Sequence, residues 1–322
     1  MQRIPLPRTD LNVSRLAYGN MTFGSQTDEA EAARILDYCF DQGINFIDTA
    51  NVYNKGAAEE MLGRLLGARR QQTILASKVR GKMGEGPLDI GLSRAAILHQ
   101  VEESLRRLRT DYLDLYYLHM PDNATPIEET LEAMDTLVRQ GKVLYPAISN
   151  YAAWQTTEIF SIGEAQGHPP IAAAQMMYNL IARGLEQEFV PMAKKYELAI
   201  VAYNPLAGGL LTGKQRRESP QSGTRFDNNQ MYLDRYWHNA MFDAVERLRS
   251  IAATAGRSMV SLSINWLLHH TATAVVLLGA SKFAQLEENV RAAEDGPLTE
   301  DVLKQCDEVW LQIRGPQPKY NR

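Results

Sequence analysis

The chain has few cysteines and no long apolar segment. Only Cys39 and Cys306 occur among 322 residues, in no spacing typical of a metal or redox site. No apolar run approaches the ~20 residues that cross a bilayer, and residues 1–5 lack the apolar core of a signal peptide. We therefore expect a cytoplasmic protein without a membrane partner, in which both thiols are free and buried.

An excess of charge of one sign is also missing. Lys and Arg number 34 and Asp and Glu number 38, so the formal net charge is −4. This balance excludes the basic surface that non-specific nucleic-acid binding requires, and we expect no nucleic-acid partner. Hydrophobic residues make up 45% and charged residues 22%, as in ordinary globular domains. These values exclude a chain that is disordered, collagen-like or coiled-coil throughout.

Short apolar runs alternate with amphipathic stretches along almost the whole chain. Eight runs are typical of buried strands, at residues 16–18, 45–47, 73–76, 112–118, 143–148, 173–176, 199–203 and 274–278. Helical spacing is typical of the stretches between them. In residues 93–108, for example, Ile97 and Val101 share one face, and Ser93 is the expected N-cap. Most steps between runs are close to the ~30 residues of a βαβ unit, but the last is much longer and indicates an insertion over residues 206–257.

The succession of eight βα units predicts an α/β fold, a (β/α)₈ TIM barrel, as a single domain over residues 1–322. We expect an N-terminal β-hairpin before the barrel, the long insertion before the eighth strand, and a C-terminal helix over residues 300–313. A doubly wound parallel sheet is the alternative. Such a sheet usually has fewer strands and a glycine-rich first turn, and the sequence shows neither.

Ionisable side chains follow the predicted strands at the end where a barrel holds its active site. Asp48 and Tyr53 follow the second strand, Lys78 follows the third, and His119 follows the fourth. Each alone is more typical of a turn, a rim or a solvated position, but together they form an acid catalyst. An ammonium lowers the pKa of a phenol from its usual value of about 10, a carboxylate keeps the ammonium charged, and an imidazole orients an oxygen or relays a proton. The set suits protonation of a carbonyl oxygen while a cofactor delivers a hydride.

Five motifs in the expected order resemble those of the aldo-keto reductase family. They occupy residues 43–50 together with Tyr53, 75–78, 111–119, 141–150 and 279–289. Within the family the chain is most similar to the aflatoxin-aldehyde-reductase-like branch, in residues 149–152, 177–179, 203–214 and 231–237, whereas residues 11–16 resemble other bacterial-type members. The resemblance implies an NADP(H)-dependent reductase that converts aldehydes or ketones to alcohols. It also implies a catalytic tetrad of Asp48, Tyr53, Lys78 and His119, with Tyr53 as the proton donor.

The resemblance further implies a nicotinamide cofactor that is bound without a Rossmann fold, and the sequence has no Gly-x-Gly-x-x-Gly turn. Ser149, Asn150 and Gln175 can hydrogen-bond a carboxamide. Tyr203 offers a ring on which a nicotinamide stacks. Glycines in the next segment let backbone N–H groups approach a pyrophosphate; the expected contacts there are Pro205, Leu206, Gly208 and Lys214.

The segment after the last strand is expected to hold the adenosine end of the cofactor. Its expected contacts are Gly279, Ser281, Lys282, Gln285, Glu288 and Asn289. The N-terminal dipole of the following helix favours a phosphate. Lys282 supplies a cation for a 2′-phosphate, which favours NADP(H) over NAD(H). Gln285 stands near a position where many NADP-selective relatives carry arginine.

Arg225, Trp237 and Arg322 are the expected substrate residues. The planar fork of an arginine can hold a carboxylate through two parallel hydrogen bonds, so the two arginines would favour carbonyl substrates that bear a carboxylate. Trp237 belongs to the long insertion, and long loops at a barrel mouth often line the pocket.

Three other interpretations have less support. The first is a P-loop of a kinase or NTPase. Residues 208–214 read Gly-x-x-x-x-Gly-Lys, but the Ser or Thr that a P-loop requires at the next position is absent. His269 and His270 have no acidic or cysteine partner at ligand spacing, so no metal is expected. A regulatory subunit is the third interpretation, because the potassium-channel β subunits resemble the same family. Against it, the barrel motifs of this sequence begin at once, without an N-terminal extension. The sequence leaves open the physiological substrate, the reaction direction and the oligomeric state, with a homo-oligomer among the alternatives.

Overall fold

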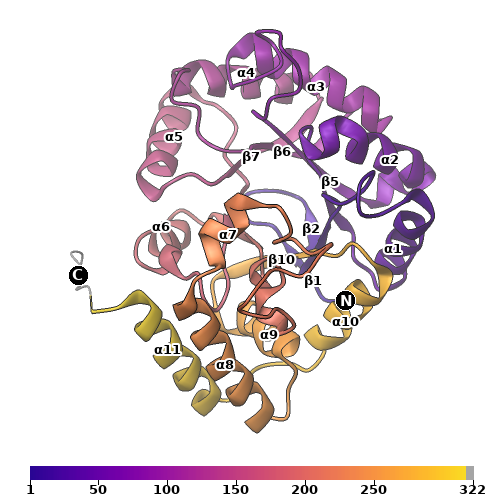
Figure 1. Cartoon of the computed structure of the whole chain (residues 1–322). Coiled ribbons are helices and arrows are strands. Elements are labelled where there is room, and N and C mark those ends of the chain that lie inside the picture. The colour runs from indigo at the N-terminus through magenta and orange to yellow at the C-terminus, as the bar shows by residue number, and fades with distance from the viewer. Residues whose placement is uncertain (317–322) are drawn as a thin grey trace.

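The computed structural model describes residues 1–316, in which eight parallel strands close into a barrel (Figure 1). Around the barrel the strands follow the order β10-β3-β4-β5-β6-β7-β8-β9. Their bounds are β3 (Leu16–Gly19), β4 (Phe46–Asp48), β5 (Ile74–Val79), β6 (Leu113–Leu118), β7 (Val143–Ser149), β8 (Ala173–Met177), β9 (Ala199–Tyr203) and β10 (Thr273–Gly279). A separate antiparallel pair consists of β1 (Arg3–Pro5) and β2 (Asn12–Ser14). The predicted barrel with its N-terminal hairpin is thereby confirmed.

Helices surround the barrel. They are α1 (Glu29–Asp41), α2 (Ala57–Leu66), α3 (Arg94–Leu108), α4 (Ile127–Arg139), α5 (Ala153–Gln166), α6 (Phe189–Lys195), α7 (Gln230–Tyr236), α8 (Asn239–Thr254), α9 (Met259–His270), α10 (Phe283–Ala293) and α11 (Glu300–Arg314). Polar residues cap helix N-termini by accepting from free N–H groups. Asp28 accepts from the N–H of Glu31 at 2.9 Å, and Ser93, the predicted N-cap, accepts from that of Ala96 at 3.3 Å.

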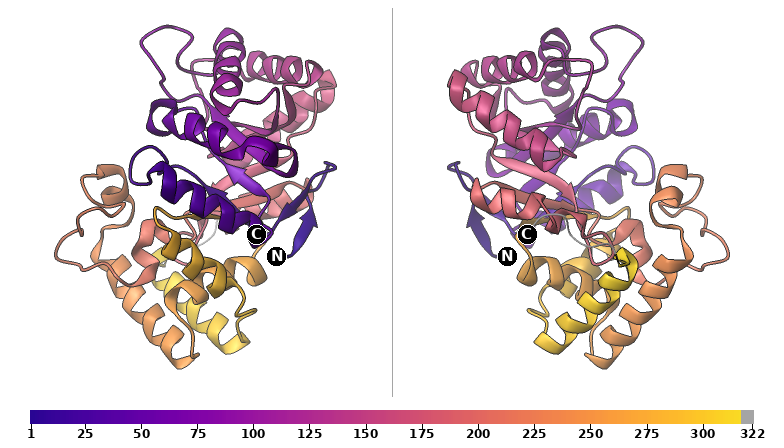
Figure 2. Two further views of the ribbon diagram at one scale, coloured as in Figure 1. Left: turned by 90° about the vertical axis from the view of Figure 1, so that its right-hand side faces the viewer. Right: turned by 90° about the vertical axis from the view of Figure 1, so that its left-hand side faces the viewer.

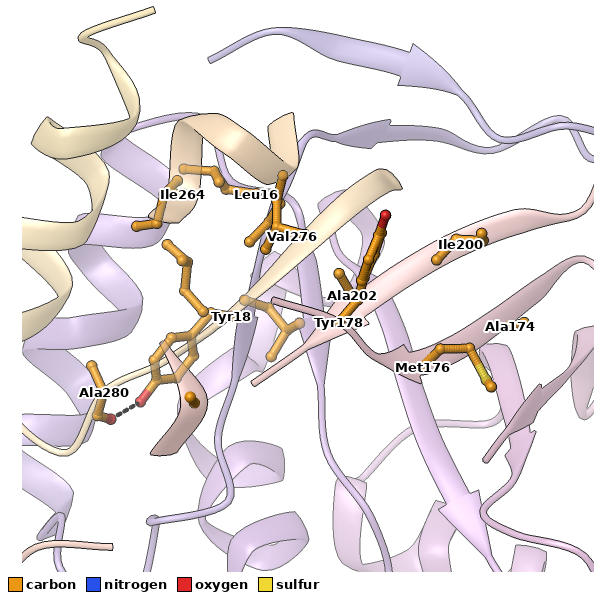
Figure 3. Packing of buried hydrophobic residues seen from close by; sticks show 14 of the residues in the cluster. Leu16, Tyr18, Ala174, Met176, Tyr178, Ile200, Ala202, Ile264, Val276 and Ala280 are labelled. Atoms are coloured by element: carbon orange, nitrogen blue, oxygen red, sulfur yellow. Dashed lines mark hydrogen bonds between the residues drawn. The ribbon is translucent and has the colours of Figure 1, made fainter. Parts of the chain in front are cut away.

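Alternate side chains of each barrel strand point to opposite sides, because the side-chain period of a strand is two. Leu16, Tyr18 and Val276 belong to the outer set, which packs against helices such as α9 with Ile264 (Figure 3). The hydroxyl of Tyr18 also donates to the carbonyl of Ala280 at 2.9 Å. The inner set is a separate buried cluster that fills the barrel and includes Ala17, Phe46, Ala76, Leu115, Tyr117, Ala147 and Val201.

The N-terminal hairpin closes one end of the barrel. Leu6 and Val13 are fully buried in the same cluster as the side chains that fill the barrel. Asn45 joins the hairpin to the start of β4. Its side-chain amide donates to the carbonyl of Asn12 at 2.9 Å, and its side-chain oxygen accepts from the N–H of Ser14 at 2.8 Å. A ligand therefore has to reach the barrel from the opposite end, where the strands finish.

The predicted insertion folds into helices, and its first part, which includes α7, lies at that opposite end. Figure 2 shows the insertion and the hairpin at the two ends of the barrel. Two hydrogen bonds tie α7 to the loops after the strands: Tyr232 donates to the side-chain oxygen of Asn204 at 3.1 Å, and Tyr236 accepts from the side chain of Asn179 at 3.2 Å. By contrast, α8 packs beside α11 (Figure 1). The sequence pattern predicted the insertion but not its helices.

Both cysteines are buried and unpaired, as predicted. Burial raises the pKa of each thiol, that of Cys306 to about 12, so neither is a thiolate at neutral pH. Among residues 1–316, no helix combines the length and the apolar character needed to cross a membrane.

Candidate active site

The inner positions at the C-terminal ends of the strands bring the four predicted tetrad residues together. Asp48 ends β4, Lys78 lies in β5, and His119 directly follows β6, each in phase with the side chains that fill the barrel. Tyr53 begins a short 3₁₀ helix (Tyr53–Gly56) after β4. The strand period therefore aims three of these side chains into the mouth of the barrel, and a turn brings in the fourth.

Lys78 lies at the centre of this cluster. Its ammonium is fully buried and forms a salt bridge with Oδ1 of Asp48. The same ammonium donates to the carbonyl of Thr49 at 2.7 Å and to the hydroxyl of Tyr53 at 3.3 Å. The rings of Tyr53 and His119 meet edge to face, with centroids 6.0 Å apart. Carboxylate, ammonium, phenol and imidazole thus form one contiguous group.

Burial and charge act in opposite directions on the pKa values of this group. Burial raises the pKa of Tyr53 and outweighs the lowering effect of the Lys78 ammonium. The lysine thus acts in the predicted direction, but the net shift of the phenol is upward. Burial lowers the pKa of Lys78, but Asp48 and Tyr53 together outweigh this effect and the pKa is raised. Burial and the charges of Lys78 and Arg80 lower the pKa of His119 to about 3. At neutral pH the group holds a protonated phenol, an ammonium and a neutral imidazole.

The four residues predicted to face a nicotinamide form a hydrogen-bonded wall beside this cluster. The hydroxyl of Tyr203 donates to the side-chain oxygen of Asn150 at 2.7 Å. The amide of Asn150 donates in turn to the carbonyl of His119 at 2.9 Å. Ser149 donates its hydroxyl to the carbonyl of Gln175 at 2.9 Å. The φ of Asn150 is 63°, a left-handed conformation that asparagine adopts more readily than most residues.

Two side chains join the cluster in ways that the sequence did not indicate. The amide of Gln175 donates to Oδ2 of Asp48 at 2.8 Å, so this residue also holds the carboxylate that pairs with Lys78. Tyr117 in β6 is fully buried, and the Lys78 ammonium lies 5.9 Å from its ring centroid. The sequence indicates the position of Tyr117 only through its spacing. Tyr117 precedes His119 by two residues, and side chains two apart on a strand face the same side.

The segment predicted to bind a pyrophosphate turns through left-handed conformations. Ala207, Gly208 and Gly209 have φ values of 49°, 68° and 101°. A Cβ at Gly208 would lie 2.7 Å from the ring of Tyr232, so the packing of α7 itself requires this glycine. A Cβ at Gly209 would meet nothing within 4 Å. The space beside this part of the backbone is therefore open.

An ion pair connects this segment to α10. The ammonium of Lys214 lies 3.1 Å from a carboxylate oxygen of Glu288, and both side chains are exposed. Pro205 is buried and Leu206 is half-buried at the start of the segment. Lys214 was predicted to lie at the pyrophosphate and Glu288 at the adenosine end of one cofactor, and the ion pair brings those two regions together.

The residues predicted to hold the adenosine end lie between the end of β10 and the second turn of α10. The side-chain oxygen of Gln285 accepts from the N–H of Ser281 at 2.9 Å and from that of Lys282 at 3.3 Å. The side chain of Lys282 is exposed, whereas Asn289 is buried. Gly279 ends β10, and a Cβ there would meet nothing within 4 Å.

Of the three predicted substrate residues, the structure describes two. The guanidinium carbon of Arg225 lies 5.6 Å from the ring centroid of Tyr232. Trp237 packs against Phe226, with ring centroids 5.0 Å apart. Both belong to the insertion at the mouth of the barrel. Arg322 lies outside the described residues.

Arg235 of α7 is a further candidate functional residue at the barrel mouth, and the sequence pattern did not single it out. Its guanidinium carbon lies 5.5 Å from the ring centroid of Tyr232, the same ring that Arg225 approaches. Burial raises the pKa of Tyr203 to about 12, against the lowering effect of the Arg235 charge. Only the folding of the insertion over the strand ends brings this arginine close to Tyr203 of the hydrogen-bonded wall.

The two adjacent histidines have a structural explanation. His269 and His270 end α9, and the ring nitrogen Nε2 of His270 accepts from the N–H of Leu298 at 2.8 Å. Among residues 1–316, no group of three or more His, Cys, Asp and Glu side chains is arranged to hold a metal ion.

Comparisons with known proteins show the family to which this chain belongs. The model of the aldo/keto reductase family matches residues 15–311. Aflatoxin B1 aldehyde reductase member 2 of Rattus norvegicus is 34% identical, over 100% of this chain and 92% of the relative. An uncharacterized oxidoreductase of Bacillus subtilis, YrpG, is 34% identical over 99% of both chains. A probable voltage-gated potassium channel subunit beta of Oryza sativa is 37% identical over 96% of both chains. The chain therefore belongs to the aldo/keto reductase family, and this membership supports an oxidoreductase activity.

Proposed function

We propose that this chain, as one domain over residues 1–322, is an NADP(H)-dependent reductase that converts aldehydes or ketones to alcohols, with Tyr53 as the proton donor. The observation that carries this proposal is the contact of one buried ammonium, that of Lys78, with both the Asp48 carboxylate and the Tyr53 hydroxyl. Membership of a family that includes aldehyde reductases supports a reaction of this class.

The surroundings of the strand ends fit a nicotinamide coenzyme. The backbone is open at Gly209 and at Gly279, where a Cβ would meet nothing within 4 Å. The side-chain nitrogen of Asn204 is buried without a hydrogen-bond partner in the described part of the chain. The residues that would hold the coenzyme are Ser149, Asn150, Gln175, Tyr203, Pro205, Leu206, Gly208, Lys214, Gly279, Ser281, Lys282, Gln285, Glu288 and Asn289. When bound, the coenzyme supplies the hydride that the carbonyl carbon receives.

The chain's own residues supply the proton and hold the carbonyl oxygen. Tyr53 donates its phenolic proton to that oxygen as negative charge develops on it. The ammonium of Lys78, 3.3 Å from the hydroxyl, stabilises the phenolate that is left, and Asp48 keeps this ammonium protonated. His119 is neutral at physiological pH, so its ring can orient the oxygen through one N–H without adding a charge.

Arg225, Trp237 and Arg322 are proposed to contact the substrate. The guanidinium groups of the two arginines would hold a carboxylate at the far end of a carbonyl substrate. The aromatic face of Trp237 would contact the apolar part between the two ends.

A cofactor-binding regulatory subunit is the alternative function, and the comparisons do not favour it. The plant relatives that carry the name of a channel subunit belong to the same family as the aldehyde reductases, so similarity to them is no argument against turnover. We also propose a cytoplasmic location, because both cysteines are free. Steady turnover of an aldehyde with NADPH separates the enzyme from the subunit.

Replacement of Tyr53 by phenylalanine tests the assignment of the proton donor. Tyr53→Phe keeps the ring and removes the acid, so turnover should fall by about 10² or more, the usual size of general acid catalysis. Affinity for NADPH, measured by fluorescence titration, should stay close to that of the wild type. In the wild type the raised pKa of Tyr53 keeps the phenol protonated at neutral pH, so reduction should slow only in the alkaline range. Near-normal turnover by the variant would contradict the assignment.

A further inference from the structure

The backbone N–H groups that open α10 are already engaged by two side chains. The oxygen of Gln285 accepts from Ser281 and Lys282, the last two residues before the helix. The first residue of the helix, Phe283, donates its N–H to a carboxylate oxygen of Glu31 at 2.7 Å. Glu31 comes from α1, on a distant part of the chain. A negative charge therefore stands at the helix end where the dipole favours an anion.

We propose that Glu31 is a coenzyme-specificity residue, which disfavours a 2′-phosphate at the N-terminus of α10 and so limits the preference for NADP(H) over NAD(H). This inference rests on the proposed function, in which that helix end receives the adenosine of the coenzyme. Lys282 acts in the opposite direction, because its exposed ammonium is positively charged and attracts a phosphate. Selectivity is then a balance between the Glu31 carboxylate and two cations, Lys282 and Arg34 of α1, whose guanidinium carbon lies 3.8 Å from the ring centroid of Phe283.

The physical reason is that the two coenzymes differ at a single charged group. A 2′-phosphate carries negative charge at neutral pH and repels a nearby carboxylate. It also has to compete with Glu31 and Gln285 for the N–H groups of residues 281–283, which would otherwise bind it. A 2′-hydroxyl carries no charge and can donate to a carboxylate. Glu31 therefore weakens the binding of the phosphorylated form and leaves the other form almost unaffected.

Replacement of Glu31 by glutamine separates charge from helix capping. In Glu31→Gln the amide oxygen can still accept from Phe283, and only the negative charge is lost. The probes are adenosine 2′,5′-bisphosphate and ADP, titrated by calorimetry into the coenzyme-free protein. Two fully hydrated unit charges about 4 Å apart change an affinity by about fivefold, and charges near a protein surface change it by more, so the affinity for the bisphosphate should rise by about fivefold or more. The affinity for ADP should change by less than about twofold.

The neighbouring carboxylate on the same helix gives a matched control. Glu29 pairs with Arg64 at 2.8 Å, away from α10, so Glu29→Gln should leave the ratio of the two affinities at the wild-type value. NADPH and NADH, titrated in the same way, should repeat the pattern.

Each outcome has a distinct meaning. An unchanged ratio in Glu31→Gln, with the wild type binding both coenzymes and reducing aldehydes, would overturn the inference and leave the proposed function standing. An equal loss of affinity for both probes would show that Glu31 only caps the helix, and would overturn it as well. If the wild type bound neither coenzyme, the proposed function would fail and the inference with it.

Discussion

Replacement of Asp48 by asparagine should destabilise the fold by about 4 kcal/mol and abolish turnover. The side chains of Asp48 and Lys78 are 1% and 0% exposed, so asparagine would leave an ammonium buried without its counter-charge. Breaking a buried ion pair from one side costs about 3–5 kcal/mol. Asparagine also has a single oxygen, whereas the carboxylate uses one oxygen for Lys78 and the other for Gln175. For a chain of this size we expect the melting temperature to fall by roughly 6 °C.

A second substitution shows whether the unpaired charge causes the loss. In the double variant Asp48→Asn, Lys78→Met neither charge of this pair is left, so at least about half of the lost stability should return. Turnover should stay absent, because the group that stabilises the phenolate is gone. Denaturant unfolding of the wild type, both single variants and the double variant gives the coupling free energy.

The pair between Arg70 and Asp114 is a matched control on neighbouring elements. Its atoms lie 2.9 Å apart, and the two side chains are 11% and 9% exposed. Asp114→Asn should lower the stability as well, but should leave kcat/KM within about threefold of the wild type, because Asp114 lies outside the tetrad.

A double variant Asp48→Asn, Lys78→Met that is no more stable than Asp48→Asn alone would refute the reasoning, because the buried charge would then not be the source of the loss.

Two further predictions concern the coenzyme and the substrate. Lys282→Ala should weaken NADPH about tenfold to a hundredfold more than NADH, because a charge-assisted hydrogen bond contributes roughly 1.5–3 kcal/mol; equal losses in titrations of the two coenzymes would assign the lysine a structural role. A carboxylate-bearing aldehyde such as a carboxybenzaldehyde should have a higher kcat/KM than its uncharged analogue, and this preference should shrink in Arg225→Ala or after removal of Arg322. Equal rates for the two aldehydes with the wild type would mean that neither arginine selects the substrate.

The sequence by itself determined the class of fold and predicted the four residues that meet at the strand ends. Strand and helix periods are local properties, set by which side chains must be buried, and eight of the expected strands became the barrel. Once a barrel is inferred, the active end follows from the direction of its strands. The period of two then predicts that Asp48 and Lys78 face the same space, as they do.

The tertiary structure alone decided how distant segments act on the site. The raised pKa of Tyr53 depends on how deeply the phenol is buried, which no local pattern reports. The packing of Tyr232 against Gly208 depends on the path of the insertion, because the turn and helix α7 meet only after the chain folds back. The hydrogen bond from Phe283 to Glu31 joins residues 252 positions apart. Such contacts are set by the closure of the barrel, which brings β10 beside β3 and so α10 beside α1. The sequence therefore predicts which groups carry the chemistry, whereas the closed barrel determines which of their charges meet.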